Sequence, residues 1–151
     1  MILHVISRLN IGGTSVWLKN LTSGLNNSGI SSKTIAGVVR DESPHSFYQD
    51  PSVEKLEFWG KNLSLISNFR ALLYIRRRIQ ETRPLVVNTH ASLGGLIGRL
   101  AVISLIKHKP RLVHTIHGHY LYGYKNKLVS IIWLLNEALF ALFTDEIVCV
   151  G

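Results

Sequence analysis

Short apolar runs alternate with longer amphipathic segments along this chain, and this alternation is its strongest structural signal. The short runs have the length of strands, and the longer segments repeat apolar residues at helical spacing. The order of these segments predicts an α/β fold, a Rossmann-like, doubly wound and mostly parallel sheet in one domain over residues 1–151. We expect strands at 2–6, 33–39, 53–59, 85–89, 111–116 and 146–150, and helices at about 14–27, 67–82, 92–107 and 128–143.

Composition agrees with a globular protein. Hydrophobic residues make up 46% of the chain and charged residues 17%, which excludes a disordered segment. Asn136 and Glu137 interrupt the apolar run 128–143, and the run falls short of the ~20 apolar residues that cross a bilayer, so we expect a well-buried helix there.

The single cysteine and the start of the chain favour the cytoplasm. Cys149 lies in an apolar run and has no partner for an internal disulfide, so we expect a small buried thiol in a reducing compartment. The chain enters a predicted strand at Ile2, without the basic and cleavage segments of a secretory signal.

Three of the predicted strands open into turns that carry glycine, histidine or small polar residues. These turns are Asn10–Gly13 after the first strand, His90–Ser92 after the fourth and His117–His119 after the fifth. Open α/β sheets bind ligands at the carboxyl ends of their strands. We therefore expect the three turns to form one rim that binds a ligand, with Gly118 in the last of them.

Gly12 and Gly13 stand between a predicted strand and the amino end of a predicted helix, with Thr14 as the expected N-cap. Such a position offers backbone N–H groups and a helix dipole to an anion; the alternative is a tight turn alone. Neither a G-x-G-x-x-G fingerprint nor a phosphate-binding G-K-[ST] loop is present, so we expect no redox cofactor.

The histidines of the fifth strand do not predict a metal site. Alternation places His114 and His117 on opposite faces, and no carboxylate or cysteine lies nearby in the sequence to complete a ligand set. We expect His114 to pack in the sheet. His117, at the strand end, can donate to a hydroxyl or phosphate, and His90 holds the matching place on the fourth strand.

Two further patterns leave alternatives open. Gly94, Gly95 and Gly98 lower the helix propensity of the third helix, and they allow either close packing on a neighbouring backbone or close approach of a ligand. The segment Arg76–Arg77–Arg78 is either a solvated helix face with one long side chain lying along the apolar stripe, or a face for anionic lipid headgroups.

The formal net charge of +8 favours an anionic partner such as a nucleotide diphosphate, a phospholipid surface or nucleic acid. A nucleic-acid surface would require exposed aromatic residues among the basic ones or a known binding module. The chain has neither, so we do not expect nucleic acid as a partner.

The chain resembles the amino-terminal domain of glycosyltransferase family 4, which has the two-domain GT-B architecture. The residues that carry the resemblance are Leu3–Gly13, Arg83–Pro84, Val86–His90, Leu96–Ala101, Val113–His119 and Thr144–Val150.

The resemblance implies that this domain shapes the acceptor side of a cleft. A carboxyl-terminal domain, not contained in these 151 residues, would hold most of the nucleotide-sugar and supply a Glu-x7-Glu motif. In the family the glycine pair lies near the donor diphosphate, the histidine of the T-x-H-G turn faces the transferred sugar, and transfer retains anomeric configuration without a metal ion. These roles fall on Gly12, Gly13 and His117. This chain has Thr14-Ser15 where the family often has Ala-Glu.

We therefore expect the acceptor-side half of a retaining transferase for polysaccharide or glycolipid synthesis, inactive without its donor-binding half. The donor would be a UDP- or GDP-linked sugar, the acceptor a sugar or lipid-linked sugar, and the ligand contacts Asn10, Gly12, Gly13, Thr14, His90, Ser92, Gly118 and His119, with His117 facing the sugar. The alternatives are a non-catalytic nucleotide- or phosphate-binding module, or a partner subunit on the inner face of the plasma membrane that docks through Arg76, Arg77 and Arg78.

Overall fold

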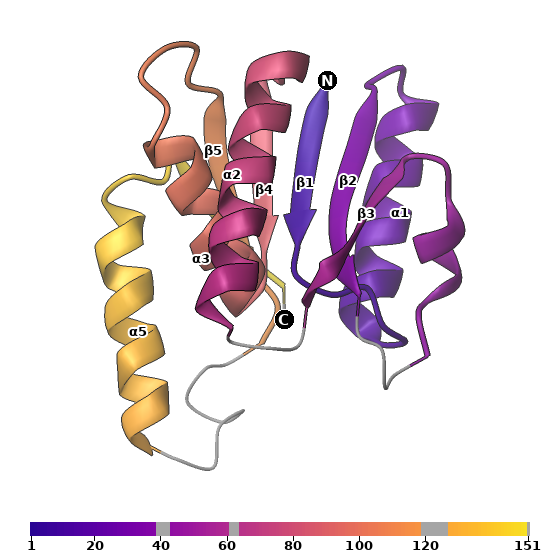
Figure 1. Cartoon of the computed structure of the whole chain (residues 1–151). Coiled ribbons are helices and arrows are strands. Elements are labelled where there is room, and N and C mark those ends of the chain that lie inside the picture. Colours follow the sequence, from indigo (N-terminus) through magenta and orange to yellow (C-terminus); the bar gives the residue numbers. More distant parts are fainter. Residues whose placement is uncertain (39–42, 61–63, 119–126, 151) are drawn as a thin grey trace.

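A computed structural model describes residues 1–38, 43–60, 64–118 and 127–150 of the chain (Figure 1). Its strands are β1 (Ile2–Ile6), β2 (Ser32–Val38), β3 (Val53–Gly60), β4 (Val86–His90), β5 (Arg111–Ile116) and β6 (Glu146–Cys149). Its helices are α1 (Gly13–Asn27), α2 (Leu65–Thr82), α3 (Ser92–Ile103), α5 (Lys127–Ala141) and the short 3₁₀ helix η1 (Ser46–Gln49). Each predicted strand and helix is present. The largest difference at an end is in α3, which stops at Ile103 instead of Lys107.

The six strands form one sheet in the order β3-β2-β1-β4-β5-β6, and each neighbouring pair is parallel. The predicted fold class, a Rossmann-like α/β domain with a parallel sheet, is therefore confirmed. Figure 1 shows α1 on one face of this sheet and α2 and α3 on the other, with α5 alongside α3.

The two faces of the sheet bury separate apolar clusters. Between the sheet and helices α2 and α3, the strand residues Leu3, Val5, Val87 and Leu112 pack with helix residues such as Ile75. On the other face, a smaller cluster lies under α1 and η1, and its buried members are Ile6, Leu9, Leu18, Ala36, Phe47, Tyr48 and Val53. Even residues of β1 thus face α1, and odd residues face α2 and α3.

The glycines of α3 serve close packing. A Cβ on Gly94 would lie 2.9 Å from the backbone nitrogen of Ser7, and a Cβ on Gly95 would overlap the ring of His114. A Cβ on Gly98 would lie 2.6 Å from the side chain of Thr89. Of the two readings that the sequence left open, packing against the strands is the one that these distances support.

Two burial predictions are wrong. Helix α5 is not well buried, because most of its large apolar side chains are exposed, Leu128, Leu135 and Leu139 among them, while Phe140 is buried. Cys149 is exposed rather than buried. The prediction of burial assumed that another part of the chain covers each apolar run. No described residue covers these side chains. No helix in the described ranges is long and apolar enough to span a membrane.

Candidate functional site

The carboxyl ends of β1, β4 and β5 lie side by side. Ile6, the last residue of β1, pairs in register with His90, the last residue of β4, and His90 pairs with Thr115 near the end of β5. The turns that follow leave the sheet along one edge, so the predicted common rim is confirmed. β1 has β2 on one side and β4 on the other, which makes this edge the switch point where open α/β sheets bind ligands.

Three histidine rings form a hydrogen-bonded chain along this edge. Nδ1 of His4 lies 3.0 Å from Nε2 of His90, and Nδ1 of His90 lies 3.1 Å from Nε2 of His117. The indole of Trp17, from α1, meets the edges of the His90 and His117 rings at centroid distances of 5.9 and 5.0 Å. Strand β1 is thereby connected to the turn after β5.

Only the outer end of this chain reaches the surface. His4 and His90 are buried, whereas His117 is half-buried. The sequence predicted that His90 contacts a ligand directly, but the His90 side chain has no exposed surface because other rings enclose it. His90 can therefore act on a ligand at the rim only through His117.

Burial keeps the histidine chain neutral. Desolvation lowers the pKa of His4 to about 4, and it lowers the pKa of His90 well below the ordinary value, with a further contribution from the neighbouring histidines. Burial also lowers the pKa of His117. At neutral pH each ring therefore carries a single N–H.

His114 is separate from this chain, as alternation predicted. Its Nδ1 lies 3.0 Å from the carbonyl oxygen of Thr89 and 2.9 Å from the Thr89 hydroxyl, on the face covered by α3. Its Nε2 lies 3.4 Å from Glu137 of α5. The pKa of His114 is lowered to about 4, chiefly by burial and next by the Arg99 charge, while Glu137 acts in the opposite direction. His114 packs in the sheet and connects it to α5.

Helix α1 begins at the rim. Its N-cap is Gly12, whose backbone oxygen accepts from Ser15 and Val16, so the prediction of Thr14 as N-cap is wrong. The hydroxyl of Ser15 donates to the carbonyl oxygen of Asn10 at 2.6 Å, which ties the turn to the first helical turn. An isolated bridge between Asn10 and Pro44 holds the other side of the same turn.

The two glycines of this turn are not required by the local backbone. Gly12 has an extended φ of 165°, which any residue can adopt. A Cβ on Gly12 or Gly13 would meet no atom of the described chain within 4 Å. Both residues are exposed, so the space beside their backbone is open to an approaching ligand.

The remaining predicted rim residues lie around this edge. Ser92 is half-buried and begins α3, directly after Ala91, whose φ of 56° and ψ of −179° form a strained turn for a residue with a side chain. Gly118 is exposed and has a φ of 123°, a conformation that favours glycine. His119 lies outside the described residues.

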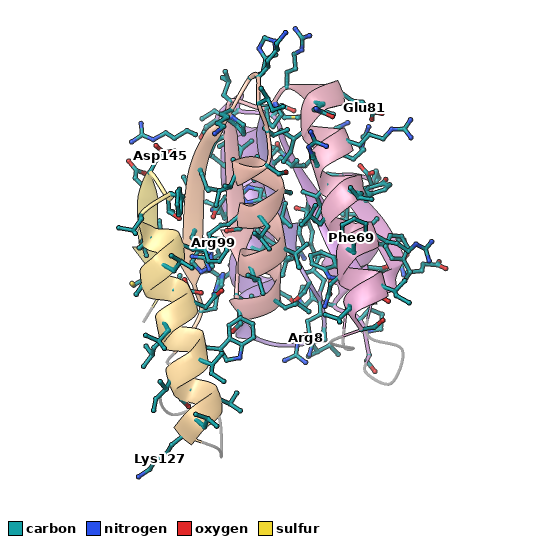
Figure 2. All side chains as sticks on the ribbon, turned by 60° about the vertical axis from the view of Figure 1, so that its left-hand side comes forward. Arg8, Phe69, Glu81, Arg99, Lys127 and Asp145 are labelled. Atoms are coloured by element: carbon teal, nitrogen blue, oxygen red, sulfur yellow. The ribbon has the colours of Figure 1, made fainter. Side chains whose placement is uncertain are left out.

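Arg77 and Arg78 of α2 lie away from the rim and are paired with carboxylates, whereas the buried Nε of Arg76 has no hydrogen-bond partner among the described residues. Arg77 donates to Glu81 at 2.7 Å, and Arg78 is bonded to both Glu54 and Glu81. Figure 2 places Glu81 and Arg8 at opposite ends of the molecule, with Arg8 at the rim. Local ion pairs thus take up much of the charge that the sequence offered to anionic lipid.

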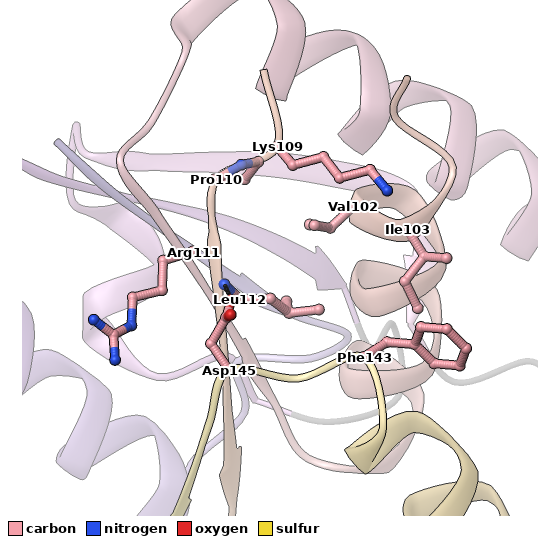
Figure 3. Close-up of a pocket in the computed structure, with 8 residues that line it drawn as sticks. All are labelled: Val102, Ile103, Lys109, Pro110, Arg111, Leu112, Phe143 and Asp145. Atoms are coloured by element: carbon pink, nitrogen blue, oxygen red, sulfur yellow. Dashed lines mark hydrogen bonds between the residues drawn. The ribbon is translucent and has the colours of Figure 1, made fainter. Parts of the chain in front are cut away.

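A pocket of about 430 Å³ lies at the opposite, amino end of the sheet (Figure 3). Lys109 and Arg111 stand at its margin, and Leu112 and Phe143 supply apolar surface. Its carboxylate, Asp145, accepts a 2.6 Å hydrogen bond from the backbone nitrogen of Leu112 and therefore serves the chain itself. The described residues contain no cluster of three side chains placed to hold a metal ion.

Sequence reasoning missed two residues of this site, His4 and Trp17. In the sequence both lie in apolar stretches, within the predicted strand 2–6 and the predicted helix 14–27, which indicate burial and not a role in the site. A histidine within an otherwise apolar strand is a signal that could have identified His4, since a buried imidazole requires a partner. The partner itself depends on strand register, which the sequence does not reveal.

The buried histidines predict that stability falls in mild acid. The folded pKa of His4, about 4, is below the ordinary value of 6.5, so the unfolded chain binds protons first as the pH drops. This contribution is complete above pH 6.5 and is lost toward pH 4, at up to ~1.4 kcal/mol per pH unit for one histidine. We expect His4→Gln to make the plot of unfolding free energy against pH shallower between about pH 6.5 and 5 by roughly that amount. Urea unfolding at several pH values measures it.

His108→Gln, at an exposed loop position, is the matched control and is expected to leave that slope unchanged. A slope for His4→Gln equal to that of the unmodified chain would contradict burial of a neutral His4.

The fold is a Rossmann-like α/β domain, and its rim lies at the switch point of the sheet, where open α/β sheets bind ligands. Residues 11–151 match the sequence model of glycosyltransferase family 4, and the chain belongs to this family.

One curated relative is the UDP-Gal:α-D-GlcNAc-diphosphoundecaprenol α-1,3-galactosyltransferase of Escherichia coli, 27% identical over 114 residues, which are 74% of this chain and 29% of the relative. Among solved structures, UDP-GlcNAc 2-epimerase from Methanocaldococcus jannaschii superposes with a TM-score of 0.66 at 17% identity, over all of this chain and 40% of the epimerase. MurG of Acinetobacter baumannii superposes with a TM-score of 0.63 at 9% identity, over 99% of this chain and 40% of MurG. The chain spans less than half the length of each.

Proposed function

We propose that this chain forms the acceptor-side half of a retaining glycosyltransferase that uses a nucleotide-sugar donor. The observation that carries the proposal is the meeting of two features at one edge: the open glycine turn before α1, and the exposed end of the histidine chain. Trp17 lies one turn into α1, and its ring centroid is 5.0 Å from that of His117. The start of the helix therefore lies beside that histidine. The name of the galactosyltransferase relative gives a UDP-sugar as donor and a lipid-diphosphate-linked sugar as acceptor. This supports the same classes of donor and acceptor for the present chain.

The start of α1 would stabilise the donor diphosphate. Negative charge grows on the leaving diphosphate during sugar transfer, and the first N–H groups of a helix together with its dipole favour an anion. No acidic residue stands in the first turn of α1 to oppose it. Arg8 is exposed at the same edge (Figure 2), and the whole chain carries a net charge of +8.

His117 would contact the transferred sugar. It is the only member of the histidine chain with exposed surface among the described residues, and Trp17 fixes its ring from the side. A ring held at this place can bond a sugar hydroxyl and shield the reacting carbon from water.

The test is a transfer assay with the chain co-expressed with a donor-binding carboxyl-terminal half of the family. We expect His117→Ala to lower kcat by about 100-fold, the usual effect of removing one preorganised donor. His108→Ala, an exposed histidine in the loop before β5, is the control and is expected to keep full turnover. Product formation from a UDP-hexose and a lipid-linked acceptor is measured. Unchanged turnover in His117→Ala would remove the proposed role.

The same assay separates this function from the second candidate, a non-catalytic binding module, which the open space beside the Gly12–Gly13 backbone would also suit. A non-catalytic module would bind UDP saturably through the Gly12–Gly13 turn. It would transfer no sugar with any donor-binding half that is co-expressed with it. Gly13→Val places a side chain in the open space beside that turn and is expected to weaken UDP binding in either case. The chain assayed alone is expected to transfer no sugar, because half of the proposed cleft is supplied by the other domain.

A further inference from the structure

The histidine chain has a defined direction. A neutral imidazole carries one N–H and one bare nitrogen, so each N···N contact needs one donor and one acceptor. His90 uses both of its nitrogens, one toward His4 and one toward His117. Burial lowers the pKa of His4 and of His90, so neither ring is charged at neutral pH. The N–H groups therefore either all point from His4 toward His117 or all point the opposite way.

The far nitrogen of His4 decides between the two directions. Nε2 of His4 is buried, and no group in the described part of the chain hydrogen-bonds to it. If the bonds pointed from His117 toward His4, His4 would carry its proton on Nε2 and leave a buried N–H unpaired. The forward direction leaves only a bare lone pair there. A buried N–H without a partner is rarer in proteins than an unsatisfied acceptor, because it is more costly.

We infer that His4 donates to His90 and His90 donates to His117, and that this relay fixes His117 in the Nδ1–H tautomer. In this arrangement Nε2 of His117 accepts from His90, and the proton of His117 is on Nδ1. Among the described residues, none hydrogen-bonds to Nδ1 of His117, and His117 is half-buried at the rim, so in this proposal its N–H is the group that meets the ligand.

The consequence for the site rests on the proposed function. His117 meets a ligand as a neutral donor to a sugar hydroxyl or phosphate oxygen, and it offers no bare nitrogen that could act as a base. His4 and His90 are positioning residues, because they act on the ligand through His117. The site thus selects for an acceptor atom on the ligand at this point of the rim.

Long-range ¹H–¹⁵N correlation spectra of the chain with ¹⁵N-labelled histidine test the tautomers directly, without any activity. We expect Nδ1–H at His4, His90 and His117. Two histidines serve as internal references. Nδ1 of His45 accepts from the backbone nitrogen of Phe47, which requires Nε2–H there. Nδ1 of His114 faces the carbonyl oxygen of Thr89, which requires Nδ1–H. An Nε2–H tautomer at His117 would overturn the inference.

A pair of variants at His4 tests the relay itself. His4→Phe keeps a ring but removes the donor, so His90 loses its fixed direction and His117 is expected to show both tautomers. His4→Gln keeps an N–H donor and is expected to leave His117 as Nδ1–H. An unchanged His117 spectrum in His4→Phe, with the references in place to show a folded chain, would mean that His4 does not set the direction.

Two substitutions of His117 connect the tautomer to the proposed reaction. An Asn amide can place its N–H near the position of Nδ1, whereas a Gln amide reaches toward the position of Nε2. We expect His117→Asn to retain transfer within about 10-fold and His117→Gln to lose about 100-fold, the usual effect of a missing donor. Equal losses in both variants would remove the donor role. The proposed function fails independently if the unmodified chain shows the expected tautomers but transfers no sugar when co-expressed with the donor-binding half.

Discussion

Replacing Gly37 by alanine is expected to destabilise the fold by about 3 kcal/mol or more, the upper range for overpacking a rigid site. Gly37 lies in β2, next to the irregular register between β2 and β3. A Cβ at this position would overlap the backbone oxygen of Ser7 and lie 2.5 Å from the backbone oxygen of Trp59. Both obstacles belong to the main chain on either side of β2, so no side-chain rotation can relieve the overlap. The midpoint of urea unfolding measures the loss.

The matched control is Gly24→Ala. Gly24 lies within α1, and a Cβ there would meet no described atom within 4 Å. Alanine at this exposed helical position is expected to stabilise the chain by up to about 1 kcal/mol, from helix propensity alone. The same substitution thus has opposite signs at the two glycines. A Gly37→Ala chain with the urea midpoint of the unmodified protein would show that the β2 backbone is not confined as described.

The path of the chain was predictable because local signals agreed with one another. Apolar runs of strand length alternate with helical repeats, and Pro84 separates α2 from β4. Parallel strands connected through helices must place their carboxyl ends on one edge, so the common rim also followed from the sequence. These inferences need only local sequence patterns and general rules of topology.

Burial was less predictable, since it depends on what covers a segment. The run that contains Cys149 is apolar, yet each residue of β6 is exposed on the described chain. The same holds for the outer side of α5. Apolarity indicates that a surface is suited to burial, but it does not indicate which partner supplies the cover.

The sequence predicted the exposed end of the histidine chain, His117, but not its buried end, His4. His117 follows a strand, where side chains commonly meet ligands. His4 lies in a strand covered on both faces, where alternation gives no hint of its neighbours. Its contact with His90 arises because β1 and β4 are adjacent and their residues pair in a particular register, a long-range property.

Substitution of Glu137 is expected to have the other large effect, again on stability. Arg99 of α3 is fully buried, and its guanidinium donates to both carboxylate oxygens of Glu137 in α5, at 2.7 and 2.8 Å. Figure 2 shows Arg99 directed from α3 toward α5. Its Nε donates to the carbonyl oxygen of Gly95, and its guanidinium lies 4.9 Å from the centre of the Phe140 ring. This pair joins the two helices, and the ring of His114 lies beside it, 3.4 Å from Glu137.

Glu137→Gln removes the negative charge and leaves a buried guanidinium without compensation, so the expected loss of unfolding free energy is about 3–5 kcal/mol. Arg99→Met alone leaves a partly buried carboxylate and is also expected to destabilise the chain. The double variant Arg99→Met, Glu137→Leu replaces both charges with apolar groups of similar size. Because the desolvation penalty of both ions disappears, the double variant is expected to be more stable than Glu137→Gln.

Urea unfolding of the unmodified chain, Arg99→Met, Glu137→Leu and the double variant closes a mutant cycle and measures the coupling between the two residues, and amide hydrogen exchange shows where it acts. Loss of protection in Glu137→Gln is expected first over 127–141, because the ion pair is a principal attachment of α5 to α3, and the double variant should regain it. If the losses of the two single substitutions simply added in the double variant, the charges would be acting separately. In that case apolar contacts alone would hold α5 in position. They would also keep Glu137 beside His114.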